Sequence, residues 1–373
     1  MRSTTDSAGA TREMAGRRWD WVSAVGLRHC LGALAAVTLA LFAPAPARAQ
    51  MPAPRFGEVV PRDVREMYDH GLQYLATSQS EKGDWSGGGG ESGPGVTGMA
   101  LMVLLASGED PNFGPYSNHV RRALRNIISA QDSTTGIMGM SMYHHGFATL
   151  ALAEAYGAVD DRSLWPDGKG PRSIGQALEL AVRAAITSQK KNPNSAWRYS
   201  PDGQDADTSV SGAVFVGLLA ARNAGIEVPD EAINKAIAYY AQMTSASGEV
   251  AYAGGMGGFG ESLARSSIAT LVFSVARRKD LKQFKATLDY LKQRIDQSGQ
   301  QMWSEYAHYY EAQALFQGDV AAWEKWNKLL VRQLKQAQAA DGSFRGQLGS
   351  SISTSLSLLA LAVNFRFLPI YER

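Results

Sequence analysis

The sequence has little cysteine, little net charge and no apolar run long enough to cross a membrane. Its single cysteine, Cys30, lies near the N-terminus, beside the apolar run from Leu31 to Phe42. That run is shorter than the roughly 20 residues that a membrane-spanning helix needs. From Gln50 onward there is no cysteine at all, which excludes disulfides, thiolate metal sites and a cysteine nucleophile.

The first 49 residues have the layout of a secretory signal peptide. Basic residues precede the apolar run, and Ala47-Arg48-Ala49 follows it as a small-residue cleavage signal. We therefore expect cleavage after Ala49 and an exported protein, periplasmic or extracellular, with residues 50–63 as an extended, proline-rich lead-in. The sequence leaves open whether export is general or twin-arginine, and whether Met1 or Met14 is the start.

Charge excludes one class of partner. Without residues 1–49, the balance of 37 Lys or Arg against 35 Asp or Glu becomes 31 against 32. No basic tract remains that could follow a phosphate backbone, so nucleic acid is not an expected partner. The sequence also contains no motif for a cofactor, so none is expected.

A motif recurs about every fifty residues: an amphipathic helix ending in glutamine, a turn with glycine and an aromatic residue, and an almost entirely apolar helix. The glutamines are separated by 52, 58, 53 and 96 residues, and stand at Gln79, Gln131, Gln189, Gln242 and Gln338. The turns carry Trp85, Gly136, Trp197, Gly248 with Tyr252, Trp303 and Phe344. Since the last gap equals two repeats, the pattern predicts six helical hairpins.

The two kinds of helix indicate two layers. Charged faces beside apolar stripes are typical of outer helices, at Val120 to Ala130, Ile174 to Thr187, Ile233 to Met243 and Trp323 to Gln338. Helices that are apolar all round, and rich in small residues, are expected inside, at Gly98 to Ala106, Phe147 to Ala155, Val210 to Ala221, Ile268 to Ala276 and Leu356 to Val363.

Neither terminal inner helix has the polar face that would end an open stack of hairpins. Closure into a ring, with the last hairpin packed on the first, buries both of them. The sequence therefore predicts an all-α protein, an α/α toroid or α6/α6 barrel over residues 64–373, with negligible strand content.

The repeat Gln-(x)n-Gly-x-Trp followed by a small-residue helix resembles the prenyltransferase and squalene oxidase repeat of the terpenoid cyclase superfamily. Four further segments resemble exported, planctomycete-type repeat proteins of this superfamily: Met142 to Thr149, Glu154 to Gly157, Trp197 to Pro201 and Asp205 to Gly212. The resemblance implies the toroid and little chemistry. Protein prenyltransferases use a zinc held by Asp, Cys and His, and thioester domains use Cys-Gly-Glu-Gln, so both chemistries are excluded here.

One alternative that the resemblance implies is an acid-initiated, squalene-type terpene cyclase. Such enzymes protonate an alkene or epoxide with the middle Asp of an Asp-x-Asp-Asp-Thr motif. The matching stretch here is Asp205-Ala206-Asp207-Thr208, one Asp short, with Asp207 as acid and Asp205 assisting. Because these residues directly precede an apolar helix, Asp207 also fits as a helix N-cap.

A second alternative is a carbohydrate-active lyase or hydrolase, with Tyr143 and His145 as base and acid and Glu154 as a carboxylate. A buried histidine bonded to a carbonyl is the competing interpretation of His145. No histidine spacing typical of a metal site is present, so no metal is expected.

The function that we favour from the sequence is binding of a hydrophobic or extended ligand, or of a partner segment, in the central cavity of the toroid. No complete catalytic motif is present, so enzymatic activity stays open. We expect the ligand to contact aromatic, histidine and carboxylate side chains near the hairpin turns, namely Tyr143, His145, Glu154, Trp197, Tyr199, Trp303, Tyr306 and Tyr309.

Overall fold

The computed structural model describes residues 60–86, 92–254, 260 and 262–371. The predicted signal peptide, residues 1–49, and most of the expected lead-in lie outside the described residues. The chain divides into two units, Met1–Arg55 and Phe56–Arg373, and the second unit contains every helix discussed below.

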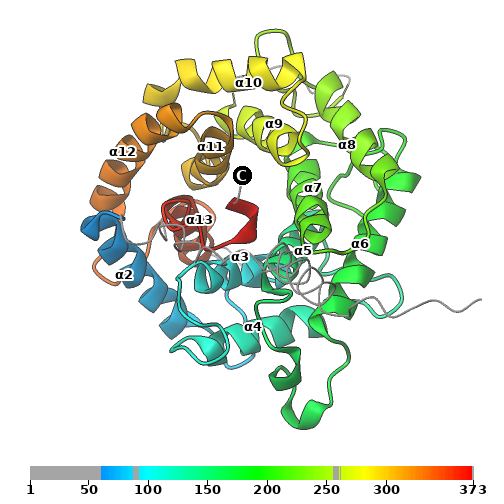
Figure 1. Cartoon of the computed structure of the whole chain (residues 1–373), viewed down its shortest axis with the longest axis vertical. Coiled ribbons are helices and arrows are strands. Elements are labelled where there is room, and N and C mark those ends of the chain that lie inside the picture. The colour runs from blue at the N-terminus through cyan, green and yellow to red at the C-terminus, as the bar shows by residue number, and fades with distance from the viewer. Residues whose placement is uncertain (1–59, 87–91, 255–259, 261, 372–373) are drawn as a thin grey trace, which may run out of the picture. The chain divides into compact units, whose positions relative to one another are not determined.

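The second unit is a closed double ring of helices (Figure 1). In its described part the outer ring holds six α-helices: α2 (Arg62–Ser78), α4 (Ser117–Ser129), α6 (Ile174–Lys191), α8 (Asp230–Gln242), α10 (Lys282–Gln293) and α12 (Val320–Ala337). The inner ring holds α3 (Pro94–Leu105), α5 (Met142–Ala155), α7 (Thr208–Asn223), α9 (Leu263–Val275), α11 (Ser304–Gly318) and α13 (Ser350–Ala362). The predicted α/α toroid of six hairpins is confirmed.

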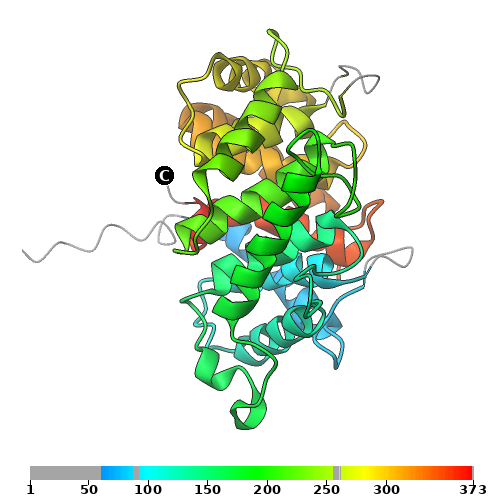
Figure 2. The ribbon, with the colours of Figure 1, turned by 90° about the vertical axis from the view of Figure 1, so that its right-hand side faces the viewer.

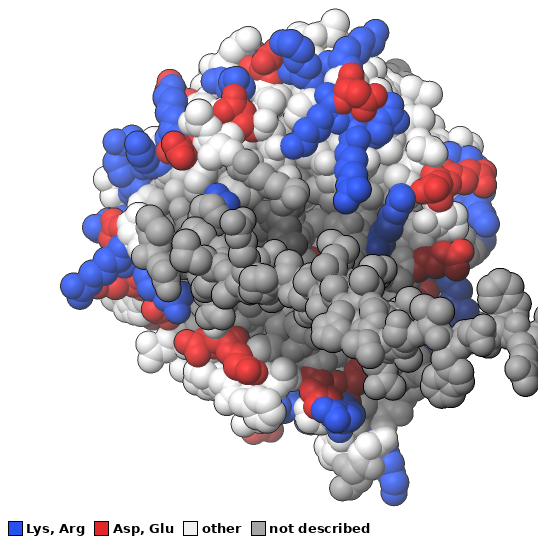
Figure 3. All heavy atoms as spheres, viewed as in Figure 1, with Lys and Arg blue, Asp and Glu red and all other residues white. Residues whose placement is uncertain are grey.

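Short elements complete the described chain. The 3₁₀ turns are η3 (Asp161–Ser163), η4 (Pro166–Gly168), η6 (Ile295–Gln297) and η7 (Pro369–Tyr371). Within the same residues, β structure amounts to four isolated bridges at the turns. Around the ring, lysines and arginines alternate with aspartates and glutamates on the face seen in Figure 3, as the near-neutral composition leads one to expect.

Burial follows the two sequence patterns. Every residue of inner helix α3 is buried, whereas outer helix α4 buries one face, with Val120, Leu124 and Ile127 at spacings of three and four. An outer helix therefore contributes one apolar stripe, while an inner helix is enclosed by neighbours on every side.

Glycines allow the inner helices to approach closely. A Cβ on Gly146 of α5 would lie 2.6 Å from the backbone carbon of Ala213 in α7, and one on Gly217 would lie 2.9 Å from the Gly146 carbonyl oxygen. On the other side of α5, a Cβ on Gly98 would lie 2.9 Å from the Phe147 carbonyl oxygen. The small residues in the inner helices are therefore required by backbone contact.

The ring is closed by contacts between the last hairpin and the first. Helix α13 packs on α2 and α3, with Leu358 against Gly71 of α2. The Tyr68 ring meets the Phe365 ring edge to face at 4.8 Å. All residues of α3 and all those of α13 after Ser350 are buried, so the described apolar faces of both terminal inner helices are covered, which is the physical reason expected for closure.

The repeated glutamines join neighbouring hairpins. In four hairpins the side-chain amide at the end of the outer helix donates two hydrogen bonds, one to a carbonyl of its own turn and one to a carbonyl of the next outer helix. The donor and its two acceptors are Gln79 with Gly83 and His119, Gln131 with Gly136 and Ala177, Gln189 with Ser195 and Ala232, and Gln338 with Gly342 and Met67. The last set crosses the junction between the two ends of the ring.

The turn glycines also lie against the next outer helix. Gly83, Gly136, Gly248 and Gly342 all have positive φ, and a Cβ at each would lie within 2.5 Å of a backbone oxygen of that helix. Ser195 adopts the same left-handed conformation in the third hairpin, at φ 54°. The four turns with glycine therefore need both its left-handed backbone conformation and its lack of a side chain.

Hairpins four and five depart from the repeat. Gln242 makes no bridging bond in the described part of the chain, and the bridges run in the opposite direction, from Gln283 to the Ala241 carbonyl and from Gln333 to the Ser298 carbonyl. Trp303 lies at its turn as expected, but it does not occupy the buried position that Trp85 has in the first hairpin. Trp85 is 1% exposed, whereas Trp303 is 42% exposed and has φ 62°.

The C-terminal segment closes one end of the ring. In Figure 2 the red segment of η7 lies on the left side of the molecule and the turn before α13 on the right. Leu368 and Ile370 are buried, and η7 packs beside α7. The Ile370 amide donates to the Glu154 carboxylate over 3.4 Å. The interior of the ring is thus filled at this end.

The substitution Gly146→Ala tests the close approach of α5 and α7. The added Cβ must displace backbone, and overpacking of a core costs about 1–3 kcal/mol, only part of which the better helix propensity of alanine offsets. We expect a lower melting temperature by circular dichroism. Gly254→Ala is the matched control, since nothing lies within 4 Å of its Cβ. Equal melting temperatures for the two variants would contradict the packing described.

The substitution Gln338→Leu tests closure of the ring. It removes both hydrogen bonds of the amide and leaves the Met67 and Gly342 carbonyls without that donor. Losses of this kind cost about 1–3 kcal/mol, and we expect earlier unfolding in urea. Gln300→Leu is the control, because that exposed amide bonds only to the Asp296 carbonyl of its own turn. If the control is destabilised as much as Gln338→Leu, the bridge contributes nothing.

Candidate ligand cavity

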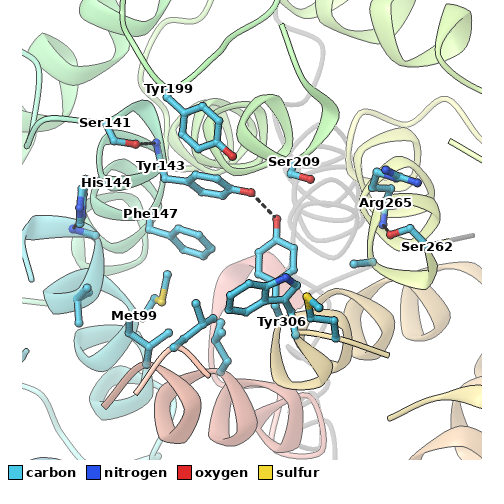
Figure 4. Close-up of a pocket in the computed structure, with 18 of the residues that line it drawn as sticks. Met99, Ser141, Tyr143, His144, Phe147, Tyr199, Ser209, Ser262, Arg265 and Tyr306 are labelled. Atoms are coloured by element: carbon cyan, nitrogen blue, oxygen red, sulfur yellow. Dashed lines mark hydrogen bonds between the residues drawn. The ribbon is translucent and has the colours of Figure 1, made fainter. Parts of the chain in front are cut away.

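The ring encloses a cavity of about 760 Å³. It lies at the end where all six inner helices begin, which we call the mouth, and its lining comes mainly from their first two turns. The lining residues are Gly95, Val96, Met99, Ser141, Tyr143, His144, Phe147, Tyr199, Ser209, Tyr252, Ser262, Ala264, Arg265, Gln301, Met302, Trp303, Tyr306, Leu348, Ile352 and Leu356. Figure 4 shows several of them facing one another across the cavity.

The apolar part of the lining comes from helices on one side of the ring. Met99 belongs to α3, Phe147 to α5, and Ile352 and Leu356 to α13. Ile352 and Leu356 are four residues apart, so they lie on one face of their helix. A side chain about one helical turn after the start of its helix can therefore line the cavity, while the rest of that helix stays buried.

Four tyrosine hydroxyls pair inside the cavity. The Tyr143 hydroxyl lies 3.2 Å from that of Tyr306 (Figure 4), and the Tyr199 hydroxyl lies 3.1 Å from that of Tyr252. The Tyr143 and Tyr199 rings are 5.8 Å apart. Burial raises the pKa of Tyr143 and of Tyr199 above the ordinary range, so both hydroxyls stay protonated. The aromatic wall therefore offers neutral donors and acceptors beside its apolar ring faces.

Arg265 of α9 carries the charge in the described lining, in which no aspartate or glutamate is found. His144 of α5 also lines the cavity, and its Nδ1 accepts from the Gly95 amide at 3.3 Å. Ser262, the N-cap of α9, accepts a hydrogen bond from the Arg265 amide. In Figure 4, Arg265 and Ser262 lie on the α9 side, across the cavity from His144 and Phe147.

Asp207 and Asp205 do not line the cavity. Asp207 is fully buried as the N-cap of α7, where one carboxylate oxygen accepts from the Val210 amide at 2.8 Å. Its other oxygen lies 3.6 Å from the Arg198 guanidinium and has no hydrogen bond in the described structure. Burial raises the pKa of Asp207 to about 6, against the lowering effects of the Val210 bond and of Arg198. Asp205 is exposed and pairs with Arg198 at 3.2 Å.

Neither His145 nor Glu154 faces the cavity, so the structure does not bring the carbohydrate-active set together. His145 is buried, accepts from the Met138 amide and contacts the Ala181 carbonyl at 3.0 Å. Burial lowers its pKa to about 4, so the ring is neutral. Glu154 lies in the last turn of α5, at the end closed by Ile370. Only Tyr143 of this set lines the cavity.

Trp197 and Tyr309 are core residues. Trp197 is 1% exposed and its indole donates to the Ala185 carbonyl of its own outer helix at 2.9 Å. Trp85 makes the equivalent bond to the Leu75 carbonyl. Tyr309 is buried between the rings of Phe147 and Tyr310. Their placement gives no support to the binding role expected for them.

Four of the predicted binding residues do line the cavity: Tyr143, Tyr199, Trp303 and Tyr306. Sequence reasoning did not select Met99, Phe147, Arg265 or Ile352. The sequence did contain a pattern that could have identified them, because each lies within about seven residues of the N-terminus of a predicted apolar helix. The turn aromatics were chosen instead, and some of them proved to be buried.

Two further findings concern metal binding and membrane insertion by the described residues. No cluster of three or more potential His, Cys, Asp or Glu ligands for a metal ion is found among them. None of the helices in the same residues combines the length and hydropathy required to cross a bilayer.

Solved structures similar to this chain are α/α toroid enzymes. An inactive variant of an α-1,6-mannanase from Salegentibacter sp. HEL1_6, in complex with α-1,6-mannotriose, has a TM-score of 0.59 at 10% identity, covering 80% of this chain and 98% of its own. A variant of the type II terpene cyclase MstE from Scytonema, in complex with its substrate geranylgeranyl dihydroxybenzoate, has a TM-score of 0.56 at 14% identity, covering 84% and 99%.

An α-amylase from Clostridium perfringens has a TM-score of 0.55 at 11% identity, covering 81% of this chain and 99% of its own. At such identities the likeness shows the toroid fold alone. No curated protein matches the sequence. One family model, described as a domain of unknown function (DUF6288), matches residues 65–337, which is more than half of the chain. The chain therefore belongs to the DUF6288 family, whose matched region spans the ring from α2 to α12.

Proposed function

We propose that this protein binds an elongated, mainly apolar ligand in its central cavity, without the acid chemistry of the toroid enzymes that it is similar to. One observation carries the proposal. The cavity of about 760 Å³ has an apolar wall of Met99, Phe147, Ile352 and Leu356 and an aromatic wall of tyrosines, and none of the described residues that line it is a carboxylate.

The size and chemistry of the cavity suit such a ligand. Sites for small molecules have volumes of roughly 300–1,000 Å³ and apolar walls with a few well-placed polar groups. Covering the apolar wall removes surface from water, which stabilises binding by roughly 25 cal/mol per Å². The paired tyrosine hydroxyls and Ser209 supply the polar groups.

The similar structures support an elongated shape for the ligand. The mannanase variant holds a trisaccharide, and the cyclase variant holds an isoprenoid joined to dihydroxybenzoate. Both are long molecules in toroids of this kind. The apolar wall of this cavity favours a ligand closer to the second than to the first.

A carbohydrate hydrolase is the less favoured alternative. Such enzymes need two carboxyl groups flanking the scissile bond. In the described lining no carboxylate is present, and Glu154 lies at the closed end of α5. The aromatic wall alone would suit a sugar as well as a lipid. The apolar wall opposite it suits a lipid and does not suit a sugar.

An acid-initiated cyclase is the alternative with a specific observation in its favour. Asp207 is buried, its pKa is raised to about 6, and the next residue but one, Ser209, lines the cavity. Against it, the carboxylate already caps α7 and points at the Val210 amide. We therefore assign Asp207 a structural role within this proposal.

Export is part of the proposal. The signal-peptide pattern of residues 1–49 supports it, and the ligand would then be met in the periplasm or outside the cell. The resemblance to planctomycete-type exported proteins rests on other segments, Met142 to Thr149, Glu154 to Gly157, Trp197 to Pro201 and Asp205 to Gly212, and membership of that group is likewise proposed.

The substitution Ile352→Trp tests the binding site. The larger side chain fills the cavity from α13, and we expect at least a tenfold loss of affinity for the apolar fluorophore N-phenyl-1-naphthylamine, measured by fluorescence titration. Ile352→Phe fills less space and should give a smaller loss in the same direction. Phe113→Trp is the control, since Phe113 is 89% exposed and does not line the cavity. Unchanged binding in folded Ile352→Trp would refute the site.

The variants Asp207→Asn and Asp207→Ala distinguish a cap from a catalytic acid. Asparagine caps helices well, whereas alanine loses about 1 kcal/mol. Because burial raises the folded-state pKa of Asp207 to about 6, wild-type stability should fall as pH rises from 4 to 6, since the unfolded chain loses this proton there while the folded chain still holds it. Asn at this position does not titrate, so its melting temperature relative to wild type should rise over that window.

The contrary result is equally clear. If Asp207→Asn follows the pH dependence of wild type, the carboxylate is not the titrating group. If wild type turns over a polyprene and Asp207→Asn stays folded but loses that turnover, Asp207 is a catalytic acid and the binding-only proposal fails.

A further inference from the structure

Arg265 is a cation at the wall of the cavity with few partners. One guanidinium nitrogen donates to the Gly260 carbonyl at 2.6 Å, while Nε is buried and has no acceptor in the described structure. The side chain is half-buried, and burial lowers the pKa of Arg265. An arginine stays charged at neutral pH even so. Its charge therefore lies in partly desolvated surroundings.

Some arginines of the protein pair with acids, whereas others, such as Arg122 and Arg125, bond an amide or carbonyl oxygen. Arg198 contacts Asp205, Arg222 contacts Asp230 and Arg278 contacts Asp280, all within 3.2 Å. Arg265 has no carboxylate within ion-pair distance among the residues that the structure describes. A partly buried charge without a counter-charge is costly, and an anionic ligand would remove that cost.

The surroundings add positive potential. All six inner helices begin at the mouth, and each helix N-terminus carries a partial positive charge. Asp207 caps the start of α7, and Glu305 lies in the first turn of α11 with its carboxylate bonded to Ser353 of α13. The start of α3 has neither a side-chain cap nor an acidic residue in its first turn. Among the described residues that line the cavity none is acidic, so none of them repels an anion.

The opposite wall has the contrary character. Phe147 and Met99 lie on the α5 and α3 side of the cavity, across from Arg265 (Figure 4), and Ile352 and Leu356 of α13 extend the apolar surface. One molecule spanning the cavity would therefore meet a guanidinium at one end and hydrocarbon at the other.

We propose that the ligand is an anionic amphiphile, with a carboxylate or phosphate headgroup bound by Arg265 and an apolar chain lying on Phe147, Met99 and Ile352. This inference rests on the proposed binding function and names the chemical class of the ligand. A neutral lipid would make the contacts with the apolar wall but would give Arg265 no counter-charge.

The test compares two ligands of equal chain length, dodecanoate and dodecanol, each displacing N-phenyl-1-naphthylamine from the full mature chain at pH 8. A hydrogen bond to a charged group contributes about 1.5–3 kcal/mol, which is roughly a tenfold or greater preference for the carboxylate. The quantity measured is the ratio of the two affinities within each variant. We expect a ratio of about ten or more in wild type, falling as NaCl is raised.

Arg265→Gln should bring that ratio close to one, and Arg265→Lys should retain part of it because the charge remains while the planar fork is lost. Arg222→Gln is the control for loss of a positive charge, since Arg222 pairs with Asp230 and does not line the cavity. It should keep the wild-type ratio.

Two failures are distinguishable. If the fluorophore and both dodecyl ligands bind and Ile352→Trp weakens all three, but the ratio is near one in wild type or unchanged in Arg265→Gln, the anionic headgroup is refuted while the binding function stands. If none of the three binds, or Ile352→Trp leaves their binding unaltered, the proposed function itself fails.

Discussion

The fold depends on one repeated interaction, a glutamine amide that bonds its own turn and the next outer helix. Each such amide satisfies two carbonyls and fixes the spacing between neighbouring hairpins. Gln338 makes the same pair of bonds across the junction, to Gly342 and Met67. Closure therefore uses the same contact as propagation around the ring. The left-handed turn glycines allow the helices to come close enough for these bonds.

The cavity follows from this arrangement. Hairpins that all turn the same way place the N-termini of the six inner helices at one end, and the C-terminal segment with Leu368 and Ile370 fills the other. Side chains in the first two turns of the inner helices then face a shared space. Arg265, which has no carboxylate partner among the described residues, makes it suited to an anion, while the apolar wall suits hydrocarbon.

The candidate site could be predicted in part. Tyr143, Tyr199, Trp303 and Tyr306 were selected from the sequence because they lie near turns, and all four line the cavity. Trp197 has the same local signal but points back to the Ala185 carbonyl. Whether a turn aromatic is buried or faces the cavity depends on its offset from the turn glycine, as Trp85 and Trp303 show with 1% and 42% exposure.

The sequence by itself determined the architecture: helix type, hairpin number and ring closure all follow from where apolar side chains recur, since an apolar face must be covered. It also placed Asp207 at the start of a helix, where its capping role is local. Only the tertiary structure decided which side chains share the cavity. Met99, Phe147, Arg265 and Ile352 come from four different hairpins, and their meeting depends on helix rotation and tilt, which no local pattern encodes.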